Sequence, residues 1–418
     1  MDALCHSRRI FILDKPIKPL YTRDMIFQTL DDKESCVASY YDGALHFDEV
    51  PADPTATWNY HTYLPDNVKF AELYTAGKTA DQVCPEELQK DWEDITSRLK
   101  GMLRSFYHVG LTPGNFCFFE LVPHRFLKQH AELKNKITQH VIQNYDEPQN
   151  YKHLVQVERL IKTISKAPIK LNPSNVRLQM ATQKGRDLYR KFQANPTITY
   201  NQFGTRTGRL TTRPNSFPVL TLPKKMRGII EPYRSVFLEF DVVSAEVATL
   251  FYLSDQPVPQ GDLHEWINQH AFNGKLTREK CKTRFFAWLY DPRKKNKKLE
   301  KLFNRSEIFE KYYNNGKITN PLGRTIEVGE EKALNYLVQS TFNDIFLHNI
   351  SKLSNKMKQW GMKSNVAFVI HDSVVLDFDA REKDKIEEIK KVLSSYDTCD
   401  FGLHMNIGKN YGDMREVE

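Results

Sequence analysis

Residues 366–376 read VAFVIHDSVVL and place an aspartate, Asp372, where an apolar run ends. A second segment of this kind, residues 237–246 with the sequence FLEFDVVSAE, carries Asp241. Both runs are rich in aromatic and β-branched residues, so both are predicted to be strands. Two buried carboxylates repel each other, and Mg²⁺, which binds one or two carboxylates plus substrate phosphates, relieves that cost. The alternative is that the two aspartates only cap turns at strand ends.

The stretch between these strands contains a predicted helix, residues 278–290 with the sequence REKCKTRFFAWLY. Arg278, Lys282, Phe286 and Tyr290 recur every four residues, which keeps them on roughly one helix face. That face is basic at its start and aromatic at its end. Two cations can hold a triphosphate, and aromatic rings can carry a base and a sugar. The alternative is an amphipathic helix with core aromatics and solvated cations.

The composition excludes several classes of protein. The chain has 418 residues, and no apolar run approaches the length of a membrane span. Six scattered cysteines without a Cys-x-x-Cys pair indicate free thiols in a reducing compartment, not a disulfide framework or a zinc site. The formal net charge of +8 suits a polyanionic partner.

These segments resemble motifs A, B and C of family A DNA polymerases, the bacterial polymerase I family. Motif A matches Asp241 with Glu246, motif B matches the helix 278–290, and motif C matches His371-Asp372. Further matches follow the family's order: TGRL at 207–210, GDLH at 261–264, NPLGR at 320–324, NYLVQS at 335–340 and NIGKNY at 406–411. The resemblance covers roughly residues 200 to 418.

The resemblance implies an α+β protein with a right-hand polymerase fold of palm, fingers and thumb. The expected domains are a small N-terminal α/β module (1–110), a helical thumb (111–200), the first part of the palm with motif A (201–265), short fingers with motif B (266–320) and the second part of the palm with motif C (321–418). The implied activity is template-directed addition of dNTPs to a primer 3′-hydroxyl.

The resemblance also implies roles for single residues. Asp241, Asp372 and the main-chain carbonyl of Val242 are expected to bind two Mg²⁺ ions. Lys282 is expected to protonate the leaving pyrophosphate. The residues expected to bind the incoming dNTP are His264, Arg278, Lys282, Phe286, Tyr290 and Glu246. The residues expected to hold primer–template DNA are Thr207, Arg209, Arg324, Gln339 and His371.

Some positions depart from the family pattern. The family usually has Glu after the motif C aspartate, whereas this chain has Ser373. Single-subunit phage-type RNA polymerases also carry His-Asp-Ser, so such an enzyme is one rival interpretation. RNA polymerases lack a glutamate at the place of Glu246, which favours DNA synthesis. A second rival is a non-enzymatic DNA-binding scaffold, and the retained Asp241, Asp372 and Lys282 argue against it.

The N-terminal region is predicted to contain strands at 9–13 and 35–41 and a helix at 86–103. In the resembled family this position usually holds a 3′–5′ exonuclease, which needs an Asp-x-Glu on an apolar strand. Neither Asp32-Lys33-Glu34 nor Asp91-Trp92-Glu93 has that setting. We therefore expect a degenerate or unrelated module without proofreading.

Two amphipathic helices, 126–144 and 151–165, are predicted to pair as an antiparallel hairpin in the thumb. The compact architecture suggests a viral or mobile-element replicase in the cytoplasm, the host cell's if viral. Its partners would be primer–template DNA and dNTPs, with a separate nuclease, clamp or helicase left open and no membrane.

Overall fold

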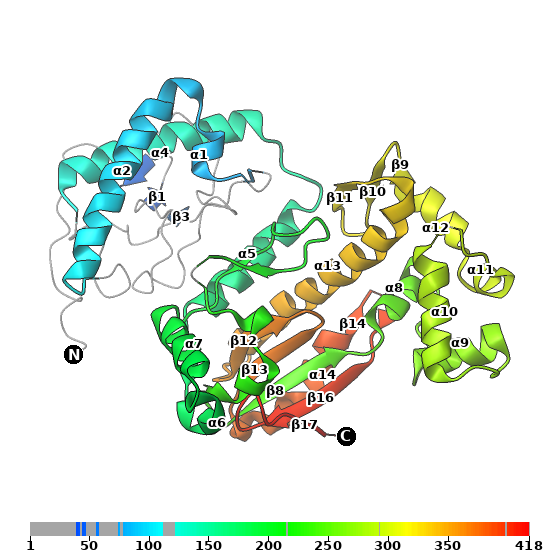
Figure 1. The fold of residues 1–418 in the computed structure, drawn as a ribbon. Coiled ribbons are helices and arrows are strands. Elements are labelled where there is room, and N and C mark those ends of the chain that lie inside the picture. The colour runs from blue at the N-terminus through cyan, green and yellow to red at the C-terminus, as the bar shows by residue number, and fades with distance from the viewer. Residues whose placement is uncertain are drawn as a thin grey trace. The chain divides into compact units, whose positions relative to one another are not determined.

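The computed structural model describes residues 39–41, 44–46, 56–57, 74–75, 78–111, 122–214, 216–291, 293–397 and 399–417. The chain divides into two units, Met1–Pro148 and Gln149–Glu418. Long helices surround antiparallel sheets, which confirms the predicted α+β class (Figure 1).

The first unit combines a small sheet with helices. The sheet has the order β2-β1-β3, and its strands are β1 (Ser39–Tyr41), β2 (Ala44–His46) and β3 (Ala56–Thr57). The described helices are α1 (Ala80–Val83), α2 (Glu86–His108) and α4 (His124–Asn144). The predicted helix 86–103 is confirmed as α2, and β1 confirms the end of the predicted strand 35–41. The predicted strand 9–13 lies outside the described residues.

The boundary between the two units falls within the region 111–200 that the sequence assigns to the thumb. Helices α4 and α5 (Tyr151–Ser165) occur where the sequence predicts them, but the boundary after Pro148 assigns them to different units. The apolar stripe of α4 joins a core with Trp92 of α2, whereas α5 packs on the long helix α13 (Glu330–Gln359). The region 111–200 therefore spans the boundary between the two units, and the apolar stripes of α4 and α5 pack in different hydrophobic cores.

The second unit is built on a five-stranded antiparallel sheet of order β12-β13-β8-β16-β17. Its strands are β8 (Val236–Val242), β12 (Asn365–Ile370), β13 (Ser373–Phe378), β16 (Leu403–Gly408) and β17 (Arg415–Val417). The run 237–246 is a strand as far as Val242 and then leads into a helix that begins at Ala245. The run 366–376, predicted as one strand, forms the two strands β12 and β13 with a turn at His371 and Asp372 between them. Since β8 lies in the middle, motif A borders motif C directly.

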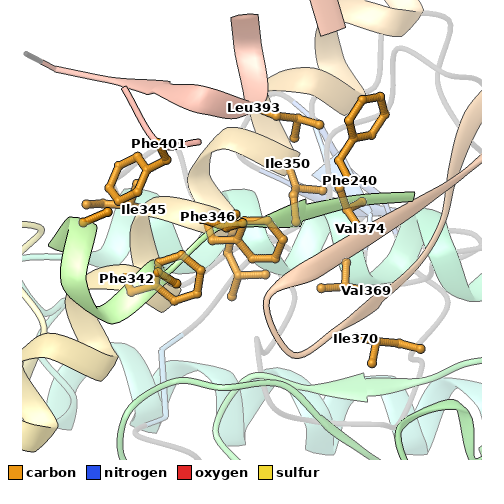
Figure 2. Packing of buried hydrophobic residues seen from close by; sticks show 14 of the residues in the cluster. Phe240, Phe342, Ile345, Phe346, Ile350, Val369, Ile370, Val374, Leu393 and Phe401 are labelled. Carbon is orange, nitrogen blue, oxygen red and sulfur yellow. The ribbon is translucent and has the colours of Figure 1, made fainter. Parts of the chain in front are cut away.

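One face of this sheet is buried by helices. Along β8 the side chains alternate, so Leu238 and Phe240 point away from the face that carries Asp241. Figure 2 shows Phe240 beside Ile350 of α13 and Leu393 of α14 (Ile386–Ser394). The opposite face carries the acidic residues Glu239 and Asp241, which are both partly buried.

A second helical group follows β8 in the chain. It comprises α8 (Ala245–Leu253), α9 (Leu263–Phe272), α10 (Arg278–Tyr290), α11 (Lys297–Phe303) and α12 (Arg305–Tyr312). The predicted helix 278–290 is confirmed as α10, which begins after the cap Thr277, whose hydroxyl accepts from the Lys280 amide. The small sheet β11-β10-β9 follows, with β9 (Tyr313–Asn314), β10 (Lys317–Thr319) and β11 (Thr325–Glu327).

Short elements complete the second unit: β4 (Lys170–Leu171), α6 (Arg177–Met180), α7 (Gln183–Ala194), β5 (Tyr200–Asn201), β6 (Thr211–Thr212), β7 (Ile230–Glu231), β14 (Ser395–Tyr396) and β15 (Cys399–Asp400). Cys84 and Cys281 are buried free thiols, as expected. Among the described residues, no helix has both the length and the apolarity needed to cross a bilayer.

Candidate active site

The structure brings the two motif aspartates together. Asp241 lies near the end of β8, and its register partner on β13 is Ser373, the residue after Asp372. The amide of Val242 donates to the main-chain oxygen of Asp372 at 3.1 Å, which ties the β12–β13 turn to the end of β8. The sheet register alone therefore places motif A beside motif C.

Electrostatics show that the two carboxylates are close. Burial, then the negative charges of Asp372 and Glu239, raise the pKa of Asp241 to about 6, and His404 opposes the shift. Such a shift means that the folded protein disfavours the ionised carboxylate here. A bound cation would reverse the local imbalance of charge.

The donor set fits Mg²⁺ in company with a substrate. Within the described residues, no group of three or more His, Cys, Asp or Glu side chains could hold a metal ion by itself. Mg²⁺ is characteristically bound by one or two carboxylates and completed by water and phosphate oxygens. Asp241 and Asp372 supply the carboxylates, and the carbonyl of Val242 is a neighbouring oxygen on the same strand.

The turns next to both carboxylates adopt an unusual backbone. Ser244 has a φ of 47° just after β8, and His371 has a φ of 51° just before Asp372. Residues other than glycine seldom adopt this left-handed region, and they cluster at functional sites when they do. The strained turns fix the direction in which the chain leaves each strand.

Helix α10 presents two faces with different tasks. Its core face is formed by Cys281, Phe285, Trp288 and Leu289, all of which are buried. The predicted face lies outside that set: Arg278 and Lys282 are exposed, and the rings of Phe286 and Tyr290 stack at a centroid distance of 5.9 Å. Phe286 and Tyr290 pack against the core and keep part of their surface exposed.

An anion-binding arrangement lies at the start of α9 and α10. His264 is 2% exposed, its ring lies 5.9 Å from that of Phe286, and its Nδ1 has no hydrogen-bond partner among the described residues. Burial and the nearby cations Arg278 and Lys282 lower the pKa of His264. A buried polar atom without a partner beside two cations suits an anionic ligand.

Asp262 holds this arrangement together. Its Oδ1 accepts from the amides of His264 and Glu265 at 2.8 and 3.1 Å and so caps α9. Its Oδ2 accepts from Nε of Arg278 at 2.6 Å. One carboxylate therefore links the first turns of both helices.

Glu246, Tyr290 and Arg209 meet although they lie far apart in the sequence. Glu246 is in the first turn of α8 and Tyr290 is the last residue of α10. Burial, then the charge of Glu246, raise the pKa of the Tyr290 hydroxyl, and the charge of Arg209 opposes this rise. Since Phe286 stacks on Tyr290, three of the residues expected to bind the incoming dNTP, Glu246, Phe286 and Tyr290, lie near one another.

The residues expected to bind DNA differ in their exposure to solvent. Arg209 and His371 are exposed, Gln339 is partly exposed and Thr207 is buried. Arg324 differs from the expected direct DNA ligand, because it is 11% exposed and its guanidinium binds Asp344 through two contacts of 2.8 and 2.7 Å.

Arg324 instead supports the loop that carries Arg209. A side chain at Gly208, which has a φ of 78°, would collide with the Arg324 guanidinium, so glycine allows the loop to lie on it. Asp344, fully buried in α13, also accepts from Asn320 at 2.8 Å and contacts His153 of α5 at 3.2 Å. Sequence reasoning missed Asp344 and His153; the signal for Asp344 was a charge within an apolar helix segment.

Sequence reasoning also missed Glu239. Ser373 Oγ lies 3.3 Å from Oε1 of Glu239 and 3.1 Å from the main-chain oxygen of Ile370, and its one hydroxyl proton is shared between these two acceptors. The alternation in FLEFD places Glu239 on the same strand face as Asp241, and that signal was present in the sequence.

No protein-family model matches the chain. A DNA polymerase of Bacillus phage SP01 is 30% identical over 99 aligned residues. The match covers 21% of this chain and 11% of that protein, so the chain spans only a small part of that relative's length. The POL domain of Pol1 from M. smegmatis, solved in complex with DNA primer-template and dNTP, is similar with a TM-score of 0.55 and 13% identity, over 69% of this chain and 76% of that chain. The chain therefore has the fold of a DNA polymerase domain.

Proposed function

We propose that this chain is a family A-like DNA polymerase that extends a primer by template-directed addition of dNTPs. The observation that carries the proposal is the register of β8 against β13, which joins Asp241 to the turn of Asp372 in a polymerase-domain fold. The likeness to a polymerase of a phage and to a domain solved with primer-template and dNTP supports the same activity.

In this mechanism the two carboxylates bind the metal ions, and residues of α10 bind the triphosphate. Two Mg²⁺ ions at Asp241 and Asp372, with the Val242 carbonyl, would supply charge at the attacking and leaving oxygens of an in-line displacement. Arg278 and Lys282 neutralise the triphosphate, and Lys282 donates a proton to the pyrophosphate as it leaves.

Different residues of the chain bind the sugar of the dNTP and the primer–template duplex. His264 contacts the triphosphate through its unpaired ring nitrogen, and Glu246, Phe286 and Tyr290 enclose the deoxyribose. Arg209, Thr207, Gln339 and His371 hold the primer–template minor groove, where acceptor atoms are similar for every correct pair. Arg324 acts indirectly, through the Gly208 loop.

In this proposal the second unit contains the palm around the five-stranded sheet and the fingers around α9 to α12. Residues 201–265 and 321–418 form the palm, 266–320 form the short fingers, and α5 belongs to the thumb. A compact viral-type replicase acting in the cytoplasm, with a separate nuclease, clamp or helicase, completes the proposal.

Proofreading is not expected. Asp91 and Glu93 lie on α2, where both are exposed around the buried Trp92, so they lack a strand-borne carboxylate setting. Asp32-Lys33-Glu34 lies outside the described residues. A primer labelled at its 5′ end and incubated with Mg²⁺ but no dNTP should stay full length, and metal-dependent shortening would contradict this part of the proposal.

Primer extension tests the function directly. The wild type should extend a primer with dNTPs and Mg²⁺, and Asp241→Asn or Asp372→Asn should abolish extension while primer–template binding stays close to wild type. The physical reason is that each change removes a metal-ligand charge without changing the side chain's volume. Extension at the wild-type rate by either variant would overturn the proposal.

The rival function is RNA synthesis, and Ser373 is the observation that favours it. The same assay with rNTPs decides between the two. Efficient incorporation of rNTPs by the wild type would replace the DNA polymerase assignment.

A further inference from the structure

Glu239 occupies a position that links three strands of the palm sheet. It lies two residues before Asp241 on β8, so both side chains emerge on the same face of the sheet. Its register partner on β16 is Asn406, and the partner of Asp241 on β13 is Ser373. The central strand thus carries two carboxylates side by side.

The contacts of Glu239 reach both neighbouring strands. Ser373 Oγ lies 3.3 Å from Oε1 of Glu239, and Asn406 Nδ2 donates to Oε2 at 3.2 Å. Ser373 itself is 5% exposed and follows Asp372 directly. Holding Ser373 therefore holds the end of the turn that carries a site carboxylate.

The Glu239 carboxylate carries a charge that its hydrogen bonds do not neutralise. In the part of the chain that the structure describes, neither Lys nor Arg forms an ion pair with Glu239. Glutamine could accept through only one side-chain oxygen, whereas the carboxylate accepts on both Oε1 and Oε2 and also places a negative charge beside Asp241 and Asp372. A third negative charge here is unfavourable unless cations occupy the site.

We propose that Glu239 is the third acidic residue of the polymerase site, a positioning residue that holds Ser373 and adds negative charge beside divalent cations bound by Asp241 and Asp372. The inference rests on the proposed function. It also accounts for Ser373, which stands where the resembled family usually has glutamate, because the Glu239 carboxylate reaches this position from the neighbouring strand.

Binding of Mn²⁺ tests the inference without relying on catalysis. Free Mn²⁺ would be measured by electron paramagnetic resonance during titration of the full chain with primer–template present and no dNTP. Glu239→Gln should weaken Mn²⁺ binding about tenfold, as changes to groups that support metal ligands do. Glu327→Gln, an exposed carboxylate on β11, is the matched control and should bind Mn²⁺ like the wild type.

Two further variants separate charge from shape. Glu239→Asp keeps the charge, and the double variant Glu239→Gln with Ser373→Glu moves the carboxylate to the neighbouring strand. At least one of them should recover most of the lost Mn²⁺ affinity. Wild-type affinity in Glu239→Gln, or recovery in neither variant, would overturn the inference.

Failure of the inference can be told apart from failure of the proposed function. If the wild type extends primers and binds Mn²⁺ but Glu239→Gln binds it equally well, only the role of Glu239 is lost. If the wild type neither extends primers nor binds Mn²⁺ more tightly than Asp372→Asn does, the proposed function itself fails.

Discussion

Single residues of α10 have separable tasks because the helix changes from basic to aromatic along one face. Lys282 is exposed at its basic end, whereas Phe286 and Tyr290 stack at its other end. In the proposed function the basic end meets charge that develops during the reaction, and the aromatic end meets a neutral base and sugar. Substitutions at the two ends should therefore change different kinetic quantities.

Lys282→Ala should lower the single-turnover rate on the order of 100-fold or more, because it removes a cation and a proton donor at the leaving group. Arg209→Ala should instead weaken primer–template binding and mismatch sensing, with a smaller effect on the rate at saturating DNA. Rapid-quench kinetics with a binding titration measure both quantities. The reverse order of effects on the rate would count against the assignment of Lys282.

Sugar selection should depend on Glu246 and Phe286. The wild type should prefer dNTPs to rNTPs on the order of 1,000-fold, because a 2′-hydroxyl meets the Glu246 carboxylate. Glu246→Ala should relax this preference, and Phe286→Tyr should raise the use of dideoxynucleotides by supplying a hydroxyl. Ratios of kcat/KM for the paired nucleotides measure both effects. Unchanged ratios in both variants would remove these residues from the sugar site.

At the scale of elements, Asp262 joins the first turns of α9 and α10, and in the proposed function these two helices bind the triphosphate as one unit. The pKa of Asp262 is lowered despite its partial burial, because Arg278 and two helix amides bind its ionised form. The ion pair with Arg278 is about half exposed, so we expect its effect on stability to be small. Its effect on ligand binding should be larger, since it sets the position of Arg278.

Asp262→Asn should keep the cap of α9, because asparagine caps helices as well as aspartate does. It should release Arg278 and raise KM for dNTPs about tenfold with little change in kcat, the pattern of lost ground-state binding. Asp262→Ala should also lower stability by about 1 kcal/mol through loss of the cap. Steady-state kinetics and thermal melts test the pair, and an unchanged KM in both variants would show that Asp262 is dispensable for binding.

An element was predicted correctly where its sequence pattern lies within one continuous segment of the chain. Helix α10 and strands β8 and β12 were predictable because their periodicity and apolar runs lie within one segment. The packing partners of α4 and α5 were not predictable, because an apolar stripe shows that a helix needs a partner and does not show which one. The buried Arg324 pair depends on residues far apart in sequence, and spacing carries no information about such contacts.

On the scale of the whole molecule, Asp344 connects parts that are distant in the sequence. It lies in the middle of α13 and contacts His153 of α5 and Arg324 after β10. The Arg324 guanidinium and the His153 hydrogen bond hold the pKa of Asp344 well below its usual range despite complete burial. The ionised carboxylate therefore stabilises the second unit.

This stabilisation has a defined dependence on pH. Because the folded pKa is depressed, the contribution is complete above the unfolded pKa of about 4 and declines as the pH falls toward the folded value. Asp344→Asn should destabilise the protein by about 3 kcal/mol at pH 7, since it leaves Arg324 nearly buried without its charge partner. The difference from the wild type should shrink below about pH 4.

Urea unfolding at several pH values measures this difference. Asp187→Asn removes an exposed pair with Arg190 and should change stability by about 0–1 kcal/mol. A difference between Asp344→Asn and the wild type that stays constant down to pH 2 would contradict the assigned role of the ionised carboxylate.

The left-handed turns at Ser244 and His371 imply a compromise between thermal stability and the rate of DNA synthesis. Each turn costs about 1 kcal/mol or more, which a sequence selected for thermal tolerance alone would recover by placing asparagine there. Natural proteins often keep such costs where activity depends on them. The variant His371→Asn should accordingly melt at a higher temperature than the wild type and copy DNA more slowly. If His371→Asn both melted at a higher temperature and copied DNA faster than the wild type, the left-handed turn at His371 would not be needed for activity.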